Sequence, residues 1–512
     1  MAAPLPLDGA DRPGTHHGRV HGNEPSGHAY SPAGDDTLTK ETQPPGIRDK
    51  DEIPTAADTR RLAERWRDAR PPAALTHLDT AACGRMSRSV IAAVAGHLAA
   101  ESERGGYVAE AEAQAALRAG RAALAELLTG APGAPGALGP DDVVPHHSAT
   151  AAFAALVAAW PLVPGALVGV IPGEYGSNAM ALAAAAERAR ATLVDLPTDP
   201  LGRIDLDALE RHGVAHADGA RIGLDALAFV TFPQIASHSG LPQPAAELAA
   251  LAASAGTDLV LDVAQSLGHV DCSAIAASAW VGTSRKWLCG PRGVGFAAAR
   301  PEVADRLRLE APNLYTATWA DAAADAAGGG GASGAGGAGQ PGGPGRARGV
   351  RGVRAWSAPR PAPGVHRIGI GESSPASRVG LARALAEARE LADGLPAGTA
   401  FAAITAIGRL ARARLDGVAG WRTVEPLDTP GAIVTLRPPP GVDPATVVRR
   451  LAREQAVLTT AIETVRAPRA LDGPLLRVSP HLYTVAADVD RLADALERDR
   501  GDQPAQSAAR VR

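Results

Sequence analysis

Short apolar runs alternate with longer amphipathic stretches along much of this chain. Runs at THLDTAA, DDVVPH, ALVGVIP, ATLVDLP, LDALAFVTF and TDLVLD predict strands. Stretches with helical spacing lie among them, at Ser89–Ala100, Ala109–Leu128, Ala149–Trp160, Asn178–Arg190 and Pro244–Ala255. Strands separated by helices indicate βαβ units and a mostly parallel sheet. Because such sheets bind ligands at the carboxyl ends of their strands, functional residues are expected there.

Two segments without apolar periodicity divide the chain. Residues 1–54 are rich in Gly, Pro, His and charge, which predicts a disordered tail. Residues 322–354 contain GGGGASGAGGAGQPGGPGRARG and are expected to form a flexible insertion. We therefore expect a large domain over 55–321, a smaller α+β domain over 355–498 and a tail over 499–512. In the smaller domain, helices are predicted at Val379–Leu395, Pro444–Gln455 and Ala486–Arg498, and strands at GAIVTLRP and PLLRVSP.

Composition narrows the function classes. With 46% hydrophobic and 21% charged residues the chain is ordinary globular protein, and its net charge of −4 argues against nucleic-acid binding. No run of about 18 strongly apolar residues predicts a membrane span. The N-terminus lacks the pattern of a secretory signal, so a cytoplasmic location is expected. The three cysteines are too few and too irregularly spaced for a disulfide framework or a metal site.

Lys286 is notable because the chain uses arginine almost everywhere else. The other two lysines, Lys40 and Lys50, lie in the predicted tail. A desolvated lysine can lose its proton whereas arginine cannot, and imine formation requires the neutral amine. A lone lysine is more often a surface residue, so this observation depends on the segments around it.

Asp262 closes an apolar run, which places its carboxylate at the carboxyl end of a predicted strand. Such a carboxylate can pair with a protonated pyridine nitrogen and keep a cofactor ring an electron sink. A helix cap or turn is an equally good explanation of this segment taken alone. Gln265, three residues later, is placed to hydrogen-bond the phenolate oxygen of the same ring.

Ser148, Ala149 and Thr150 stand between a predicted strand and an Ala-rich helix. Free backbone N–H groups and two hydroxyls meet there, and such a helix N-terminus binds phosphate well. Taken alone, the segment is better explained as an ordinary Ser/Thr cap. Neither a P-loop motif nor a dinucleotide-binding glycine motif occurs, which disfavours nucleotide binding.

Together these segments resemble the class-V aminotransferase family of pyridoxal phosphate enzymes, which includes cysteine desulfurases and isopenicillin-N-epimerase-like proteins. The family has an Asp-x-x-Gln pair, then a Schiff-base lysine, then Gly-Pro-x-Gly. Asp262, Gln265, Lys286 and the segment 290–293 match in that order. The resemblance covers about residues 78–496 without the insertion. It implies a type I fold with a mostly parallel seven-stranded sheet, pyridoxal 5′-phosphate carried by Lys286, and a homodimer.

The resemblance extends to further cofactor residues. PGEYGSN is similar to the family's Glu-His-His-x-Asn segment, which implies that Tyr175 stacks on the cofactor ring. Thr283 and Arg285 fall where the family places phosphate ligands, although Arg285 replaces the more usual His. Ser237, in PQIASHSG, is implied near the cofactor by a looser match.

Two other residues are implied in substrate binding and dimer formation. RVSPHLYTVAADVD resembles the family's Arg-x-Ser-x-x-x-Tyr-Asn-Thr segment, so Arg477 would hold the substrate carboxylate by a bidentate pair. ESSP resembles the Gly-Thr-Pro segment that reaches the partner subunit's phosphate, which makes Ser374 a contact across a dimer.

One departure from the family restricts the chemistry. Cysteine desulfurases need a nucleophilic Cys in a small-domain loop, but AVLTTAIETVRAPR has none and no cysteine follows Cys289. Cys83 and Cys289 are better explained as small buried hydrophobes. Desulfuration through a protein persulfide is therefore disfavoured.

Within the family, LDTAACGRMSRS, GGYVAEAEA and SHSG resemble the C–S lyases of ergothioneine biosynthesis. The resemblance implies β-elimination of hercynylcysteine sulfoxide, a cysteine conjugate, to ergothioneine, pyruvate and ammonia, with Lys286 as general base. Another class-V activity (an epimerase, an aminotransferase or another cysteine-conjugate lyase) is the alternative, and pyruvate formation distinguishes them. A catalytically silent binding module is a third hypothesis, against which the intact Lys286, Asp262 and Gln265 argue.

Overall fold

The computed structural model describes residues 53–216, 219–319 and 358–501. These residues belong to one compact unit that spans Arg48–Arg512. The predicted insertion over 322–354 and nearly all of the predicted tail over 1–54 lie outside the described residues. The same holds for the predicted C-terminal tail beyond helix α13 (Ala486–Gly501), which runs slightly past its predicted end.

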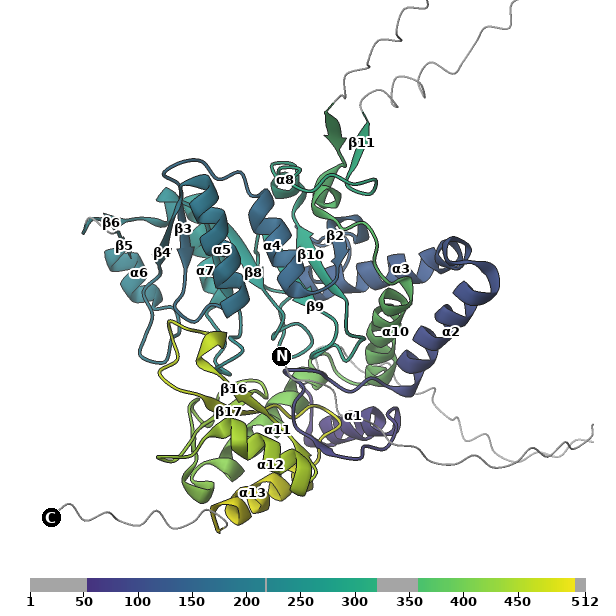
Figure 1. The fold of residues 1–512 in the computed structure, drawn as a ribbon, viewed down its shortest axis with the longest axis vertical. Helices are drawn as coiled ribbons and strands as arrows, with labels where there is room; N and C mark the ends of the chain where they lie inside the picture. The colour runs from purple at the N-terminus through teal and green to yellow at the C-terminus, as the bar shows by residue number, and fades with distance from the viewer. Residues whose placement is uncertain (1–52, 217–218, 320–357, 502–512) are drawn as a thin grey trace, which may run out of the picture. The chain divides into compact units, whose positions relative to one another are not determined.

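A seven-stranded sheet forms the centre of the larger domain (Figure 1). Strand β10 runs antiparallel to both of its neighbours, β2 and β9. The other neighbouring strands of the sheet pair in parallel. This confirms the predicted α/β fold with a mostly parallel sheet of seven strands. In sheet order the strands are β2 (Val143–His146), β10 (Gly295–Ala299), β9 (Ala279–Thr283), β8 (Asp258–Asp262), β7 (Leu227–Pro233), β3 (Leu167–Val170) and β4 (Thr192–Asp195).

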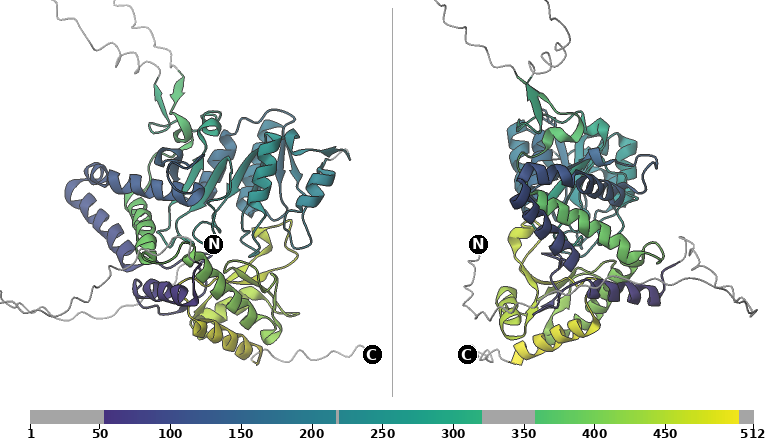
Figure 2. Two further views of the ribbon diagram at one scale, coloured as in Figure 1. Left: turned by 180° about the vertical axis from the view of Figure 1, so that it is seen from behind. Right: turned by 90° about the vertical axis from the view of Figure 1, so that its right-hand side faces the viewer.

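Helices cover both faces of this sheet, because apolar side chains alternate along the strands. In β7, Val230 and Phe232 join the apolar core on one face, whereas Phe229 joins the core on the other. The first core includes α3 (Gly106–Thr129), α6 (Leu206–His212), α7 (Ala245–Ala255) and α10 (Pro375–Ala392). The second includes α4 (Ala149–Ala159), α5 (Gly176–Ala189) and α8 (Pro301–Ala304). Figure 2 shows the layers from two further sides.

Helix α10 follows the insertion in sequence, yet it packs with the large domain. Leu381 and Leu385 contribute to the core that contains α3. The helix also contacts α2 (Arg88–Arg104), where Arg383 Nε donates to Ser89 Oγ at 3.0 Å. The larger domain is therefore built from helices that precede the insertion in sequence and from α10, which follows it.

The smaller domain contains a four-stranded antiparallel sheet in the order β13 (Arg422–Thr423), β14 (Val434–Arg437), β17 (Leu475–Val478) and β16 (Thr460–Ile462). Helices α11 (Thr399–Leu415), α12 (Pro444–Glu454) and α13 share its apolar core. Buried Arg412 of α11 donates to four backbone carbonyls, of Leu427, Thr429, Gly431 and Ile433. Before α2 in the chain, α1 (Ala56–Asp68) packs against α11, and β1 (Thr76–His77) pairs with β15 (Val457–Leu458).

Two short ladders complete the described secondary structure. Strands β11 (Ala317–Trp319) and β12 (Pro359–Pro361) pair antiparallel on either side of the segment 320–357. Strands β5 (Val214–Ala215) and β6 (Arg221–Ile222) form the other ladder. No helix in the described ranges combines the length and the apolar character needed to cross a membrane.

Candidate active site

A pocket at the carboxyl ends of β2, β7, β8 and β9 contains most of the residues predicted for the site. Lys286 and Asp262 face it together with the start of α4. All predicted site residues line it except Arg477 and Ser374. Its lining consists of Ser148, Ala149, Thr150, Tyr175, Asn178, Pro233, Ile235, Ser237, Asp262, Ala264, Gln265, Thr283, Arg285 and Lys286.

Lys286 follows β9 closely and lies partly buried in this pocket. Burial lowers the pKa of its amine to about 7, and the charges of Arg285, Arg477 and Arg466 act in the same direction. The carboxylate of Asp262 opposes this effect. A large share of Lys286 is therefore a neutral amine at neutral pH, which is the form that attacks a carbonyl.

Asp262 is the last residue of β8, and its side chain is buried. Its two oxygens accept hydrogen bonds from the backbone N–H of Ala264 and from Asn178 Nδ2, each at 2.8 Å. Burial raises the pKa of Asp262, while Lys286 and these hydrogen bonds oppose the rise. The carboxyl group is thus held in one orientation at the floor of the pocket.

Asn178 and Glu174 were not singled out from the sequence. Asn178 Nδ2 donates to Glu174 Oε1 at 3.1 Å as well as to Asp262, so one amide bridges two carboxyl groups. Glu174 Oε1 also accepts from the N–H of Tyr175 at 2.8 Å, and Oε2 has no hydrogen-bond partner among the described residues. Burial, followed by the charge of Asp262, raises the pKa of Glu174 to about 8. The Glu-x-x-x-Asn spacing in PGEYGSN, used only to place Tyr175, was the signal for both.

The first turn of α4 closes one end of the pocket. Ser148 caps this helix, its Oγ accepting from the N–H of Ala151 at 3.1 Å. The helix start lies directly against β10: a Cβ added to Gly295 would come within 2.5 Å of Ala149 N, so only glycine fits there. The backbone N–H groups of Ala149 and Thr150 have no acceptor among the described residues and can bind an anion.

Thr283 and Arg285 lie beside this helix start. Thr283 Oγ1 donates to Val294 O at 3.1 Å. The partly buried guanidinium of Arg285 has no hydrogen bond or ion pair with the residues that the structure describes, and burial lowers its pKa. An unpaired cation at the open end of a helix suits a phosphate group.

Three further predicted residues line the pocket: Gln265, Tyr175 and Ser237. Gln265 Nε2 donates to Ala81 O and its Oε1 accepts from Trp287 Nε1, both at 3.0 Å. Tyr175 is the residue that precedes α5. Ser237 Oγ is buried without a partner in the described chain, which marks a place for a ligand atom.

The two predicted residues that do not line the pocket have other contacts. Arg477 is buried; it donates to Ser237 O at 3.0 Å and forms an ion pair of 3.4 Å with Asp79. Its charge nevertheless acts on Lys286. Ser374 is exposed and caps α10, its Oγ accepting from the N–H of Ser377 at 3.2 Å.

The donor set of the pocket fits pyridoxal 5′-phosphate. It combines an amine of lowered pKa, a buried carboxylate, a helix N-terminus with hydroxyls, and the unpaired Ser237 Oγ. These groups match the aldehyde, ring nitrogen and phosphate of the cofactor. Within the described ranges, no group of three or more His, Cys, Asp or Glu side chains could hold a metal ion.

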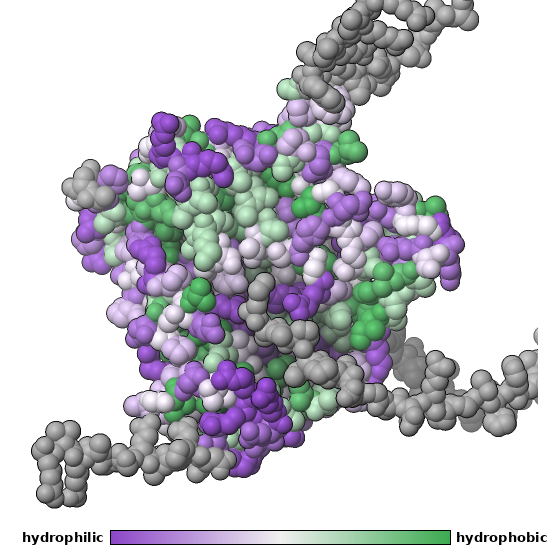
Figure 3. Space-filling view, in the orientation of Figure 1, coloured by the Kyte–Doolittle hydropathy of each residue, from purple (hydrophilic) through white to green (hydrophobic). Residues whose placement is uncertain are grey.

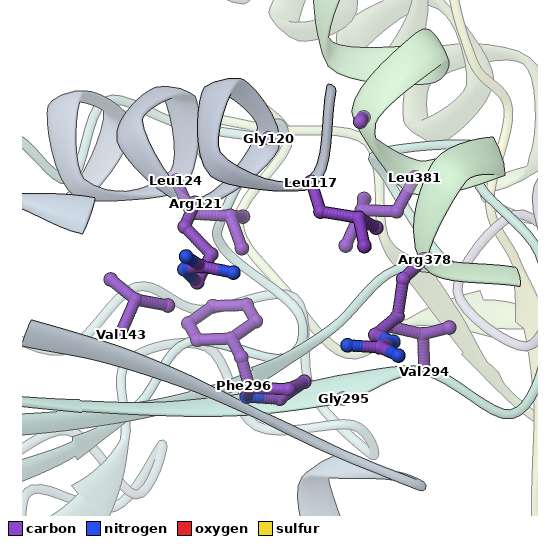
Figure 4. A pocket seen from close by; sticks show the side chains of 12 residues that line it. Leu117, Gly120, Arg121, Leu124, Val143, Val294, Gly295, Phe296, Arg378 and Leu381 are labelled. Carbon is purple, nitrogen blue, oxygen red and sulfur yellow. The ribbon is translucent and has the colours of Figure 1, made fainter. Parts of the chain in front are cut away.

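A second pocket lies between α3, α10 and the β2–β10 edge of the sheet (Figure 4). Its lining is largely apolar, with Phe296, Val143 and several leucines, and the guanidinium groups of Arg121 and Arg378 also face it. It contains neither an amine nor a carboxylate, so we do not consider it a catalytic site.

Comparisons with known proteins agree with this pocket chemistry. Residues 76–329 match the family model described as aminotransferase class-V. The chain is 38% identical over 436 residues, 85% of its length, to a probable hercynylcysteine sulfoxide lyase from Mycobacterium tuberculosis (strain CDC 1551 / Oshkosh), of which it covers 93%. It is 29% identical to isopenicillin N epimerase from Streptomyces clavuligerus, over 53% of this chain and 60% of that protein.

Solved structures of low sequence identity share the fold. The cysteine desulfurase CsdA from Escherichia coli superposes with a TM-score of 0.66 at 19% identity, over 85% of this chain and 98% of that one. The cystine C–S lyase C-DES, in complex with cysteine persulfide, gives 0.65 at 16% identity, over 83% and 98%. The sequence match over most of a relative's length and this shared fold show that the chain belongs to the class-V aminotransferase family of pyridoxal phosphate enzymes.

Proposed function

We propose that this protein is a C–S lyase that cleaves hercynylcysteine sulfoxide by β-elimination, leading to ergothioneine, pyruvate and ammonia. The observation that carries the proposal is the pairing, in one pocket, of the Lys286 amine, whose pKa is lowered, with the buried carboxylate of Asp262. The name of the M. tuberculosis relative supports the choice of substrate. The absence of cysteine after Cys289 argues against a persulfide route.

The cofactor, when bound, supplies an electron sink for the electron pair of the substrate Cα–H bond. The neutral amine of Lys286 would act as general base and take the proton from the substrate Cα. Asp262 would pair with a protonated ring nitrogen, and the hydrogen bond from Asn178 fixes the carboxylate for that role. Arg477 receives the α-carboxylate in exchange for part of its contact with Asp79.

The remaining predicted residues position the cofactor. Ser148, Ala149 and Thr150 offer the phosphate a helix N-terminus, and Thr283 and Arg285 add a hydroxyl and an unpaired cation. Tyr175, which lines the pocket, would cover one face of the ring. Gln265 retains one amide hydrogen for the phenolate oxygen, since its hydrogen bonds with Ala81 and Trp287 use one N–H and one lone pair.

The decisive assay incubates purified protein and pyridoxal phosphate with hercynylcysteine sulfoxide and a thiol reductant. We expect pyruvate and ergothioneine in equal amounts. Lys286→Ala should lose both products and the bound-cofactor absorbance, because the amine that bonds the cofactor is absent. Bound cofactor without pyruvate would keep the cofactor site and reject the lyase; racemised amino acid would favour an epimerase.

We also propose that the protein is a homodimer. The exposed face of α2 carries Ile91 and Leu98, and Tyr107 and Val108 at the start of α3 are exposed too. Figure 3 shows apolar surface over the region of α2 and α10. The family resemblance of the ESSP segment is the reason to expect that Ser374, the cap of α10, contacts the partner subunit's phosphate in this dimer. Light scattering should show a dimer for wild type. The double variant that combines Ile91→Glu with Leu98→Glu should be a monomer.

A cytoplasmic location completes the proposal. All three cysteines are free thiols, and Cys272 and Cys289 are buried while Cys83 is partly exposed. Free thiols suit a reducing compartment. Fractionation of the producing cells tests this location.

A further inference from the structure

The loop that follows β16 lies beside the active-site pocket. Its short helix η5 spans Thr464–Arg466 and packs against the beginning of α5. A Cβ added to Gly176 would collide with Val465 O and would lie 3.6 Å from Arg466 O. Because Gly176 directly follows Tyr175, this contact places η5 next to the wall of the pocket.

The guanidinium of Arg466 has no counter-ion among the residues that the structure describes. Its side chain is partly buried, and it makes no hydrogen bond or ion pair within the described chain. Arg469, on the same loop, differs: it is exposed and pairs with Asp195 at the end of β4. Leaving a partly buried guanidinium unpaired costs stability, so such a group is expected to meet an anionic ligand.

The position of this charge relates it to the reaction. The backbone of Arg466 adjoins Gly176, the residue after pocket-lining Tyr175, and its charge acts to lower the pKa of Lys286, as well as those of Arg285 and Arg477. Arg477 is already tied to Asp79, and Arg285 stands beside the helix start that suits phosphate. Arg466 therefore remains available for a second negatively polarised group of the substrate.

On the basis of the proposed function, we propose that Arg466 is a catalytic residue that donates hydrogen bonds to the sulfoxide oxygen of the substrate. When Lys286 removes the Cα proton, the Cα–H electron pair forms the Cα=Cβ bond and the Cβ–S pair leaves on sulfur. The departing group is a sulfenate, whose oxygen carries more negative charge than the sulfoxide oxygen did. A fixed guanidinium stabilises that charge more in the transition state than in the ground state. The sulfenate then takes up a proton, and an external thiol reduces the sulfenic acid.

The test compares two leaving groups in Arg466→Gln. Hercynylcysteine sulfoxide needs a donor to the departing oxygen, whereas β-chloro-L-alanine undergoes the same Cα deprotonation and releases chloride. We expect the ratio of kcat on the sulfoxide to kcat on the chloride to fall about 100-fold, the usual effect of removing one transition-state donor. Arg466→Lys should restore part of the ratio, and Arg469→Gln, on the same loop, should leave it unchanged.

Other outcomes would overturn the inference. Equal losses on both substrates would assign Arg466 to the carboxylate or to the fold, and no loss on either would remove it from the reaction. Wild type that releases pyruvate from β-chloro-L-alanine but not from the sulfoxide would reject the proposed function, and this inference with it. Failure of the proposed function would be seen in the wild-type protein itself. Failure of this inference alone would be seen only when Arg466→Gln is compared with wild type.

Discussion

Glu174→Gln should change how the stability of the apo protein depends on pH. The buried carboxyl of Glu174 has its pKa raised from 4.5 to about 8 by burial and by Asp262. The raised pKa means that the folded protein holds the proton that the unfolded chain releases. Ionisation of the unfolded chain therefore destabilises the native protein progressively from about pH 4.5 to pH 8. Gln has the same shape but cannot ionise, so this penalty is absent in the variant.

The magnitude follows from the interval between the two pKa values. Each pH unit between 4.5 and about 8 costs about 1.4 kcal/mol, so wild type loses at most about 5 kcal/mol relative to the variant. Urea denaturation of both apo proteins between pH 5 and 9 measures the difference. We expect similar midpoints near pH 5 and a variant that is increasingly the more stable one up to pH 8.

The control for this experiment is Glu187→Gln, an exposed glutamate on α5, the helix that begins just after Glu174. This substitution should leave the pH profile of wild type unchanged. Parallel profiles of wild type and Glu174→Gln would refute the reasoning, because they would mean that Glu174 ionises normally in the folded protein.

Three further experiments test the site and the fold. The rate at which pyridoxal phosphate loads onto apo protein, measured by stopped-flow absorbance, should rise with pH to a plateau. The midpoint should lie near pH 7, because burial lowers the pKa of Lys286 to about 7. A midpoint near pH 10 would contradict this. Gly295→Ala should weaken cofactor affinity about tenfold or more in absorbance titrations, because the added Cβ pushes the start of α4 away; Gly96→Ala, with no neighbour within 4 Å, should not. Arg412→Leu should destabilise the protein by about 3 kcal/mol or more in denaturant titrations, since four carbonyls lose a buried charged donor.

Much of the large domain could be predicted from apolar periodicity. The predicted helices at Ala149–Trp160 and Pro244–Ala255 correspond to α4 and α7. Strands β9 and β10 were not predicted, because AWVGT and GFAAA are short and flank the lysine motif. Helix α11 was missed as well, since its Ala-rich sequence has little contrast between faces.

The cofactor residues were predictable for a different reason. They lie at the carboxyl ends of strands and at the start of a helix. In a parallel sheet these ends meet at the edge where ligands bind, so their location can be read from the sequence. Glu174 and Asn178 act through side-chain contacts across 84 residues, from Asn178 to Asp262, and periodicity does not reveal such pairs. Arg466 was missed because the loop that carries it packs against the beginning of α5, far away in sequence.

The β11–β12 ladder has a consequence for how this chain can change in evolution. It holds Trp319 opposite Pro359, so the two ends of the intervening segment are already adjacent in space. Changing the length of that segment alters a loop closure whose free energy grows only slowly with length. Sequences can therefore be inserted or deleted there while the strand ends that hold the active site keep their positions. A variant in which a tight turn joins Trp319 to Pro359 should therefore keep the ladder and the active site.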